Sequence, residues 1–115
     1  MSIEKSIHAI LQKTYEFSEE IRQLVGSCNM NRITDHTINY LTISALCKAI
    51  VDHFRQQNIK ASFRILSFED GIAVVKFTIN DEGIIIPIDV SIFDSYEFKF
   101  VVGEIMFKLN TLLGD

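Results

Sequence analysis

Two cysteines and two of the three histidines supply the sulfur and imidazole groups of a candidate zinc site: Cys28, His36, Cys47 and His53. Their spacing is C-x7-H-x10-C-x5-H, whereas structural zinc sites take their ligands from closely spaced pairs. Cys47 and His53 would also point to different faces of one helix, because they are six residues apart. We therefore expect neither a metal site nor a cofactor.

The same two cysteines are the candidate nucleophiles. Cys47 lies in a strongly apolar stretch, which raises the pKa of a thiol and makes it unreactive. Cys28 lies in a polar stretch near Arg32 and His36, so it is the more reactive candidate. Nothing in the sequence places a general base against it. Two cysteines are also too few for a disulfide framework.

Acidic side chains occur as the adjacent pairs Glu19–Glu20, Glu69–Asp70 and Asp81–Glu82. The first pair belongs to the polar face of a helix, and the other two belong to turns, so solubility and turn chemistry explain them. The five glycines are isolated from one another, which excludes a glycine-rich phosphate loop. The sequence thus predicts no catalytic residue, and we expect a protein that is not an enzyme.

The net charge of −4 disfavours a nonspecific electrostatic contact with nucleic acid. One basic cluster, Lys48, Arg55, Lys60 and Arg64, lies close together in sequence around the end of a predicted helix. Without exposed aromatic residues between them, four charges are a weak indication of nucleic-acid binding. Contact with an acidic protein partner is at least as plausible.

Two helices are predicted to precede the strands, over residues 2–25 and 37–57. The first has side chains at steps of 4, 3, 4, 3, 4 and 3 residues, which lays a narrow stripe along one side of the helix. All but one of them are apolar: Ile3, Ile7, Ile10, Thr14, Phe17, Ile21 and Leu24. The second helix is apolar around most of its circumference, which predicts a central position between the sheet and the first helix.

Alternating apolar residues then predict strands over 61–68, 72–79 and 84–93, with turns at 69–71 and 80–83. Pro87 predicts that the third strand is at an edge or bulged, because proline has no amide proton. The alternation of Tyr96, Phe98, Phe100 and Val102 favours a fourth strand followed by a short helix from Gly103. A single helix over residues 94–113 is the alternative. In both cases Ile105, Leu109 and Leu112 face inward.

The fold class predicted over residues 1–115 is a single α+β domain: two N-terminal helices, an antiparallel meander of three or four strands, and a C-terminal amphipathic helix on one face of the sheet. The order of a helix, three strands and a helix resembles, in outline, that of the double-stranded-RNA-binding domain. That resemblance implies lysines at the start of the last helix, where this sequence has Asp94, Ser95, Tyr96 and Glu97. The element order also resembles the small, acidic and dimeric chaperones of secretion systems.

The stripe on the first helix is the candidate protein interface. The stripe packs within the chain, on a second copy, or on another protein. Burial of its six apolar side chains would contribute about 9–18 kcal/mol to stability before the entropic cost of ordering them is subtracted. We expect a small non-enzymatic protein-binding module that self-associates through its N-terminal helices as a homodimer, or captures a protein partner. The alternatives are an enzyme or small-ligand domain with a pocket between sheet and helices, and a nucleic-acid-binding domain. No signal peptide and no membrane-spanning run is visible, so we expect a cytoplasmic location.

Overall fold

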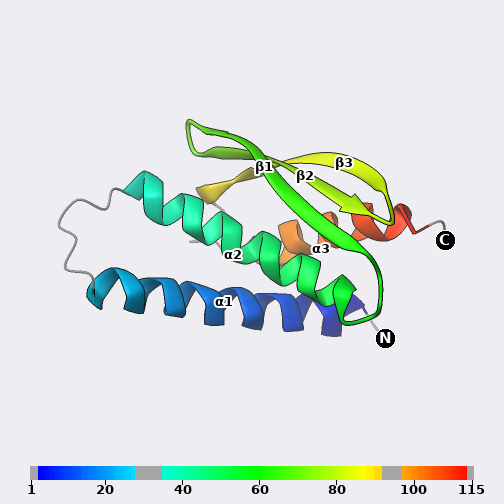
Figure 1. Ribbon diagram of the computed structural model, residues 1–115, viewed down its shortest axis with the longest axis horizontal. Coiled ribbons are helices and arrows are strands. Elements are labelled where there is room, and N and C mark those ends of the chain that lie inside the picture. The colour runs from blue at the N-terminus through cyan, green and yellow to red at the C-terminus, as the bar shows by residue number, and fades with distance from the viewer. Residues whose placement is uncertain (1–2, 28–34, 92–96, 114–115) are drawn as a thin grey trace.

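The computed structural model describes residues 3–27, 35–91 and 97–113. Two helices come first, a three-stranded meander follows, and a third helix ends the described chain (Figure 1). This order confirms the predicted α+β class and the two-helix, meander, helix sequence of elements. The elements are α1 (Ile3–Ser27), α2 (Asp35–Arg55), β1 (Ala61–Glu69), β2 (Ile72–Ile79), β3 (Glu82–Asp89) and α3 (Phe98–Thr111).

The strands form one antiparallel sheet in the order β1-β2-β3. Alternate residues of the central strand β2 are fully buried, and they form the inner row of the sheet: Ala73, Val75, Phe77 and Ile79. Pro87 lies on β3, so the prediction of an edge strand is confirmed.

Both hairpins have two-residue turns with positive φ at both positions, as type I′ turns require. Asp70 and Gly71 have φ of 53° and 75°, and Asn80 and Asp81 have φ of 49° and 72°. The second turn is therefore shorter than the predicted 80–83 turn, and Glu82 already pairs with Ile79. β3 correspondingly begins at Glu82 and ends at Asp89, so the predicted bounds 84–93 are wrong at the start, and Val90 and Ser91 do not belong to the strand either. At the other end, the predicted residues 92 and 93 lie outside the described ranges.

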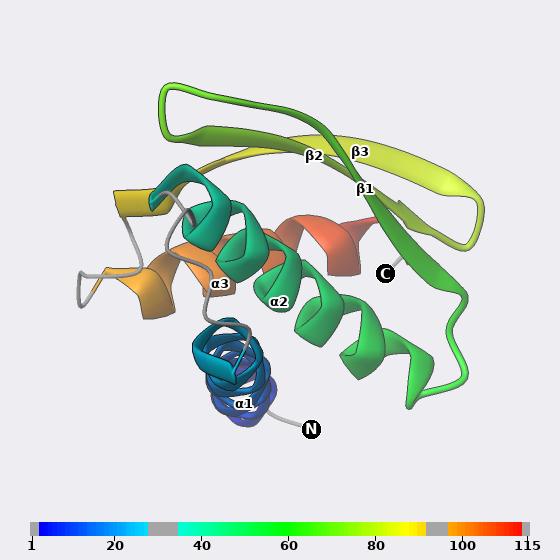
Figure 2. The same cartoon turned by 60° about the vertical axis from the view of Figure 1, so that its left-hand side comes forward.

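The helices form two layers on one side of the sheet (Figures 1 and 2). α2 and α3 lie directly beneath the strands, and α1 lies beyond them, where it contacts both helices. The inward side of α3 contributes four buried residues, Val102, Ile105, Met106 and Leu109. The predicted central position of α2, between the sheet and α1, is thus confirmed.

The predicted fourth strand is wrong for residues 98–102, because the chain is helical from Phe98 onward. Apolar residues recur there at helical spacing, so a helix buries Val102, Ile105 and Leu109 together on one side. A strand over this segment would place only alternate residues inward and would break that continuous row. Packing on α1 and the sheet therefore overrides the β propensity of the aromatic residues. Asp94 and Tyr96, where the two alternatives began, lie outside the described residues.

Gly103 lies inside α3 and not at its start, and it lets α1 and α3 approach closely. A Cβ atom built on Gly103 would lie 3.1 Å from Cδ1 of Ile7. The missing side chain therefore makes room for an α1 residue of the predicted stripe, and the glycine is explained by packing between helices.

Candidate protein interface

The first part of the predicted stripe on α1 is buried inside the chain. Ile7, Ile10 and Thr14 are 7%, 1% and 3% exposed, and Phe17 is partly buried against the same core. The side chains of Ile3, Ile21 and Leu24 lie outside the described residues. α1 thus covers α2 and α3 with these residues, and their role in an interface between proteins stays a prediction.

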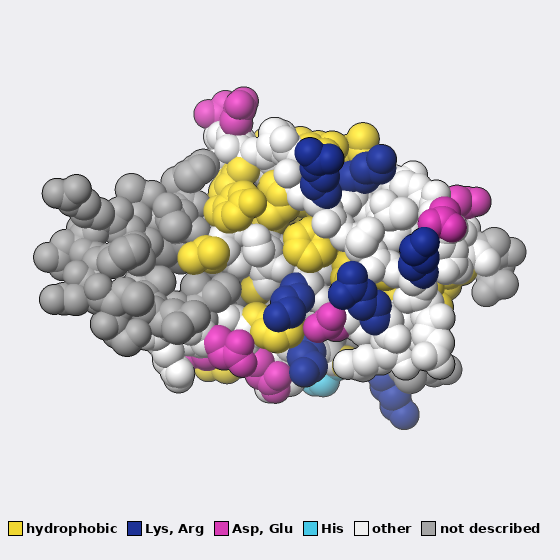
Figure 3. Space-filling view, viewed as in Figure 1, with side chains coloured by type: hydrophobic (Ala, Val, Ile, Leu, Met, Phe, Trp, Pro, Cys, Tyr) yellow, Lys and Arg dark blue, Asp and Glu magenta, His cyan; other side chains and the backbone are white. Residues whose placement is uncertain are grey.

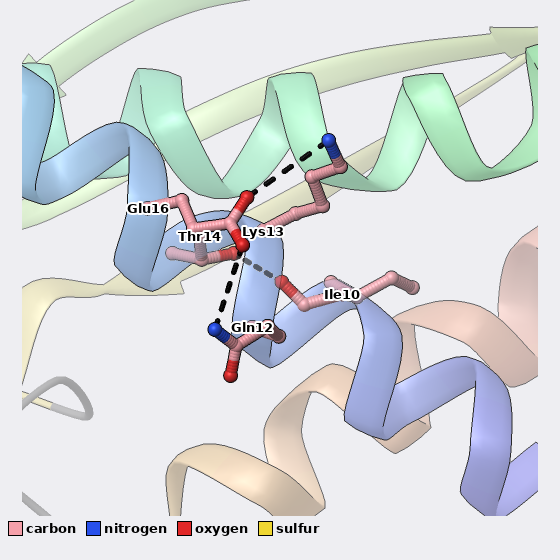
Figure 4. Close-up of polar contacts among 5 residues, drawn as sticks. All are labelled: Ile10, Gln12, Lys13, Thr14 and Glu16. Atoms are coloured by element: carbon pink, nitrogen blue, oxygen red, sulfur yellow. Dashed lines mark hydrogen bonds and ion pairs between the residues drawn. The ribbon is translucent and has the colours of Figure 1, made fainter.

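Thr14 is the polar member of the stripe, and its own helix satisfies it. The hydroxyl group donates a hydrogen bond to the carbonyl oxygen of Ile10 at 2.7 Å (Figure 4). Because this bond replaces water, the threonine can be buried without a partner from another element. The break in the apolar pattern therefore needs no ligand or second chain to explain it.

A cavity of about 260 Å³ lies between the outer flanks of α1 and α2. Its polar lining includes Glu16 from α1 and Asp52 and His53 from α2. Glu16 accepts a hydrogen bond from Gln12 at 3.5 Å and lies 3.9 Å from the ammonium nitrogen of Lys13 (Figure 4). Partial burial lowers the pKa of His53. The cavity lies between two helices and not between the sheet and the helices, where the ligand-binding alternative expected a pocket.

Cys47 is fully buried in α2, and burial raises the pKa of its thiol to about 12. It is therefore protonated at neutral pH and unsuited to nucleophilic attack or metal binding. Cys28 and the side chain of His36 lie outside the described residues. Within the described ranges, no three His, Cys, Asp or Glu residues come together as metal ligands. None of the helices described has the length and hydropathy needed to cross a bilayer.

Two phenylalanines of α3 project into solvent, and the sequence analysis did not find them. Phe100 and Phe107 are each 68% exposed. They are seven residues apart, about two helical turns, so they lie on the same side of α3. The signal was present in the sequence, because the helical alternative places both opposite the inward Ile105 and Leu109. The strand interpretation concealed it by counting Phe100 as part of an inward row.

The predicted basic cluster is brought together in three dimensions. Lys and Arg side chains gather over α2 and the sheet, with hydrophobic side chains between them (Figure 3). Lys76 lies opposite Arg64 across β1 and β2, on the same face of the sheet, and its side chain extends over Gly83 of β3. We call this region the basic surface, and it consists of five exposed residues, Lys48, Arg55, Lys60, Arg64 and Lys76.

The basic surface is only partly neutralised. Lys60 forms an ion pair with Asp81 at 3.0 Å, while Arg55 donates from Nε to the carbonyl oxygen of Ala61 at 2.9 Å. The ammonium nitrogen of Lys48 lies 4.5 Å from the centre of the Phe17 ring. Among the ion pairs of the described residues, none involves Lys48, Arg55 or Arg64. These three charges thus remain available to an acidic group.

No family model, no curated protein and no solved structure matches this chain.

Proposed function

We propose that this chain is a small non-enzymatic protein-binding module, acting as an adaptor, a chaperone-like protein or an inhibitor. The observation that carries the proposal is the outward face of α3, where Phe100 and Phe107 are each 68% exposed. Fully burying a phenylalanine contributes about 1.5–3 kcal/mol, so a partner covering both would gain about 2–4 kcal/mol from them. Large aromatic side chains are also the residues most enriched at protein interfaces.

The chemistry of the described residues supports a binding role over a catalytic one. The buried thiol of Cys47 is protonated, and the carboxylate of Glu16 pairs with side chains of its own helix. A free, buried cysteine also fits a reducing compartment, which supports the expected cytoplasmic location.

Self-association through the N-terminal helices is part of the proposal. Because Ile7, Ile10 and Thr14 are buried, a contact between copies through α1 would use its outer side, where Tyr15 is 62% exposed. Sedimentation velocity over a range of concentrations tests this part. A homodimer is the expected result, and a stable monomer at several hundred micromolar would remove self-association from the proposal.

The binding role is tested with a double variant, Phe100→Ser with Phe107→Ser. Both side chains are exposed, so the variant should fold with the same circular dichroism spectrum as the parent protein. Tagged parent and variant proteins are compared by affinity isolation under native conditions, with Ile85→Ser on β3, where Ile85 is 57% exposed, as the matched control for loss of an exposed apolar side chain. Partner proteins retained by the parent and the control, and lost by the double variant, are the expected result. An identical set on all three proteins would contradict the proposal.

A small-ligand-binding role is the second candidate, and the cavity between α1 and α2 favours it. Its volume of about 260 Å³ is slightly below the range of about 300–1,000 Å³ that is usual for ligand pockets. Nuclear magnetic resonance titration with small amine and carboxylate fragments tests it at the amides of Asp52 and His53. Saturable shifts there would support this role, and their absence at millimolar fragment would remove it.

A further inference from the structure

The backbone of β1 offers unused hydrogen-bonding groups along its outer edge. The amide of Asn80 donates to the carbonyl oxygen of Lys60 at 2.9 Å, which fixes the alternation of the ladder between β1 and β2. The backbone N–H and C=O groups of Ser62 and Arg64 therefore bond to β2. The corresponding groups of Ala61, Phe63 and Ile65 point away from β2. The bond from Arg55 to the Ala61 carbonyl oxygen agrees with this alternation, and it already occupies that acceptor, so the unused groups are those of Phe63 and Ile65. Of the strands in the described ranges, only β2 pairs with β1.

The opposite edge of the sheet is blocked. The amide of Val90 donates to the carbonyl oxygen of Gly71 at 2.9 Å, so Ile88 and Ile86 bond to β2 and Pro87 faces outward. Proline has no N–H group, so the centre of the β3 edge lacks a donor. The ladder of β1 shifts register between Ile65 and Ser67, so its regular edge ends at Ile65. Up to that residue, β1 is the better template for a further strand than the edge that Pro87 interrupts.

The inner row of β1 is incompletely covered. Phe63 and Ile65 are partly buried, whereas Phe77 and Val75, their partners on β2, are fully buried. The apolar row thus continues to the edge of β1 and stops there with surface still exposed. A strand added at this edge would cover that surface with its own inward side chains.

Positive charge lies on both sides of the same edge. Arg64 is exposed on the outer face of β1, while Arg55 of α2, which packs beneath β1, reaches the edge through its bond to the Ala61 carbonyl oxygen. The ammonium group of Lys48 lies over the Phe17 ring of α1 instead. Figure 3 shows the Lys and Arg side chains above and below the apolar surface of this region. A segment lying along β1 would therefore meet cations on either side of its backbone.

We propose that the outer edge of β1, over residues 63–65, binds an extended segment of a partner protein in which acidic and apolar residues alternate. The segment adds a fourth strand: its apolar residues cover Phe63 and Ile65, and its acidic residues face Arg64. This inference rests on the proposed binding function and supplies the chemistry of the partner and the site.

The charges distinguish this occupant from two others. A second copy pairing through β1 would bring its own Arg64 and Arg55 to the same edge, where like charges repel. A nucleic acid would meet the cations, but it has no backbone amides to match the alternating donors and acceptors of Phe63 and Ile65. The unpaired backbone and the cations together therefore favour an acidic peptide.

The test uses a fluorescein-labelled peptide of alternating Glu and Val, measured by fluorescence anisotropy with the full chain. Two further peptides carry N-methyl groups on all Val amides or on all Glu amides, which removes the donors and leaves the charge unchanged. In an antiparallel strand, the residues opposite Phe63 and Ile65 bond to β1, so methylation of the Val amides abolishes binding and methylation of the Glu amides does not. A parallel strand reverses the two results.

The protein variants are Arg64→Glu and, as a control with the same charge change on α3, Lys99→Glu. Reversal at Arg64 should raise the dissociation constant by about tenfold, and the control should change it less than about twofold. Backbone amide shifts on binding should be largest at Phe63 and Ile65.

The inference would be overturned if no peptide bound at millimolar concentration, or if the two methylation patterns had an equal effect on binding. It would also be overturned if a single-stranded oligonucleotide bound more tightly than the peptide and Arg64→Glu weakened that binding. Concentration-dependent shifts at Phe63 without peptide would indicate a second copy at the edge and would also overturn it. Since the Phe100→Ser, Phe107→Ser comparison changes no residue of β1, failure of the β1 site leaves that test of the binding function intact.

Discussion

Thr14 illustrates how one residue can look functional in a sequence and be structural in the fold. Its hydroxyl group bonds to the carbonyl oxygen of Ile10, one turn earlier in the same helix. A buried hydroxyl without any acceptor would cost about 1–3 kcal/mol, so this local bond is what allows a polar residue in the stripe. A pattern of residue types cannot supply that information, because it depends on the side-chain conformation.

Cys47 allows a prediction about pH. Burial raises the pKa of its thiol to about 12 in the folded protein, while the unfolded chain ionises near its ordinary value of about 8.5. Above that value the unfolded state loses a proton that the folded state keeps, so stability falls as the pH rises. The free energy of unfolding should drop by about 1–2 kcal/mol between pH 8 and pH 10 because of this group.

Urea denaturation at the two pH values checks this expectation in a Cys28→Ser background, which leaves Cys47 as the only thiol. The control is the same protein with Cys47→Ala, which keeps every other titrating group. An equal loss of stability in both proteins would contradict the raised pKa. The folded Cys28→Ser protein should also react with a thiol reagent only as fast as it unfolds.

At the scale of the elements, the contact between α1 and α3 depends on Gly103. A Cβ atom there would lie 3.1 Å from Cδ1 of Ile7, a contact that a small shift of a flexible side chain can relieve. Gly103→Ala should therefore change stability by less than about 1 kcal/mol, since gained helix propensity opposes the crowding. Gly103→Leu should lose about 1–3 kcal/mol, because a large side chain forces the two helices apart.

Urea denaturation of both variants measures these differences. Phe107→Leu, at an exposed position of the same helix, serves as the control for a change to leucine that is away from α1. If Gly103→Leu were as stable as the parent protein, the close approach of α1 and α3 would not be a real constraint.

The elements also show where the sequence was sufficient. α1, α2 and the hairpins were predictable because their period and turn residues are local properties, as with Asp70–Gly71. The first turn of α3 was not, because Phe98, Phe100 and Val102 alternate as in a strand, while Phe98, Val102 and Ile105 recur at helical spacing. The packing of Val102 against the core decides between the two periods, and that contact joins residues far apart in the chain.

At the scale of the whole molecule, the stripe on α1 divides into a buried part and a partly covered part. Ile10 is 1% exposed, whereas Phe17 is partly buried and lies beneath Lys48. Ile10→Ala should lower the free energy of unfolding by about 2–5 kcal/mol, a large share of the total for a small domain. Phe17→Ala should cost less, because its ring keeps solvent contact in the folded protein.

Circular dichroism during urea denaturation at two protein concentrations checks this contrast. If Ile10 stabilises the fold within one chain, the loss for Ile10→Ala is the same at both concentrations. A loss that shrinks at the higher concentration would mean that Ile10 packs between copies, and the intramolecular arrangement would then be wrong.

The candidate sites were less predictable than the fold. Lys48, Arg55, Lys60 and Arg64 were found as a cluster because they are close in sequence, but Lys76 joins them only through strand pairing. The exposed Phe100 required the correct assignment of the first turn of α3, whereas Phe107 belongs to a helix in both predicted alternatives. The free backbone of β1 has no residue signature, because it depends on strand order and on the alternation of the ladder.

The difference between the two edges of the sheet also bears on fibre formation. Stacking copies into an open-ended filament requires the β1 edge of one copy to bond to the β3 edge of the next, so that each addition leaves a fresh template. Pro87 interrupts that second edge in every copy. Contact between two β1 edges remains geometrically possible, but it closes on itself after one pair and cannot propagate. We therefore expect Pro87 to hinder open-ended polymerisation of the sheet at high protein concentration.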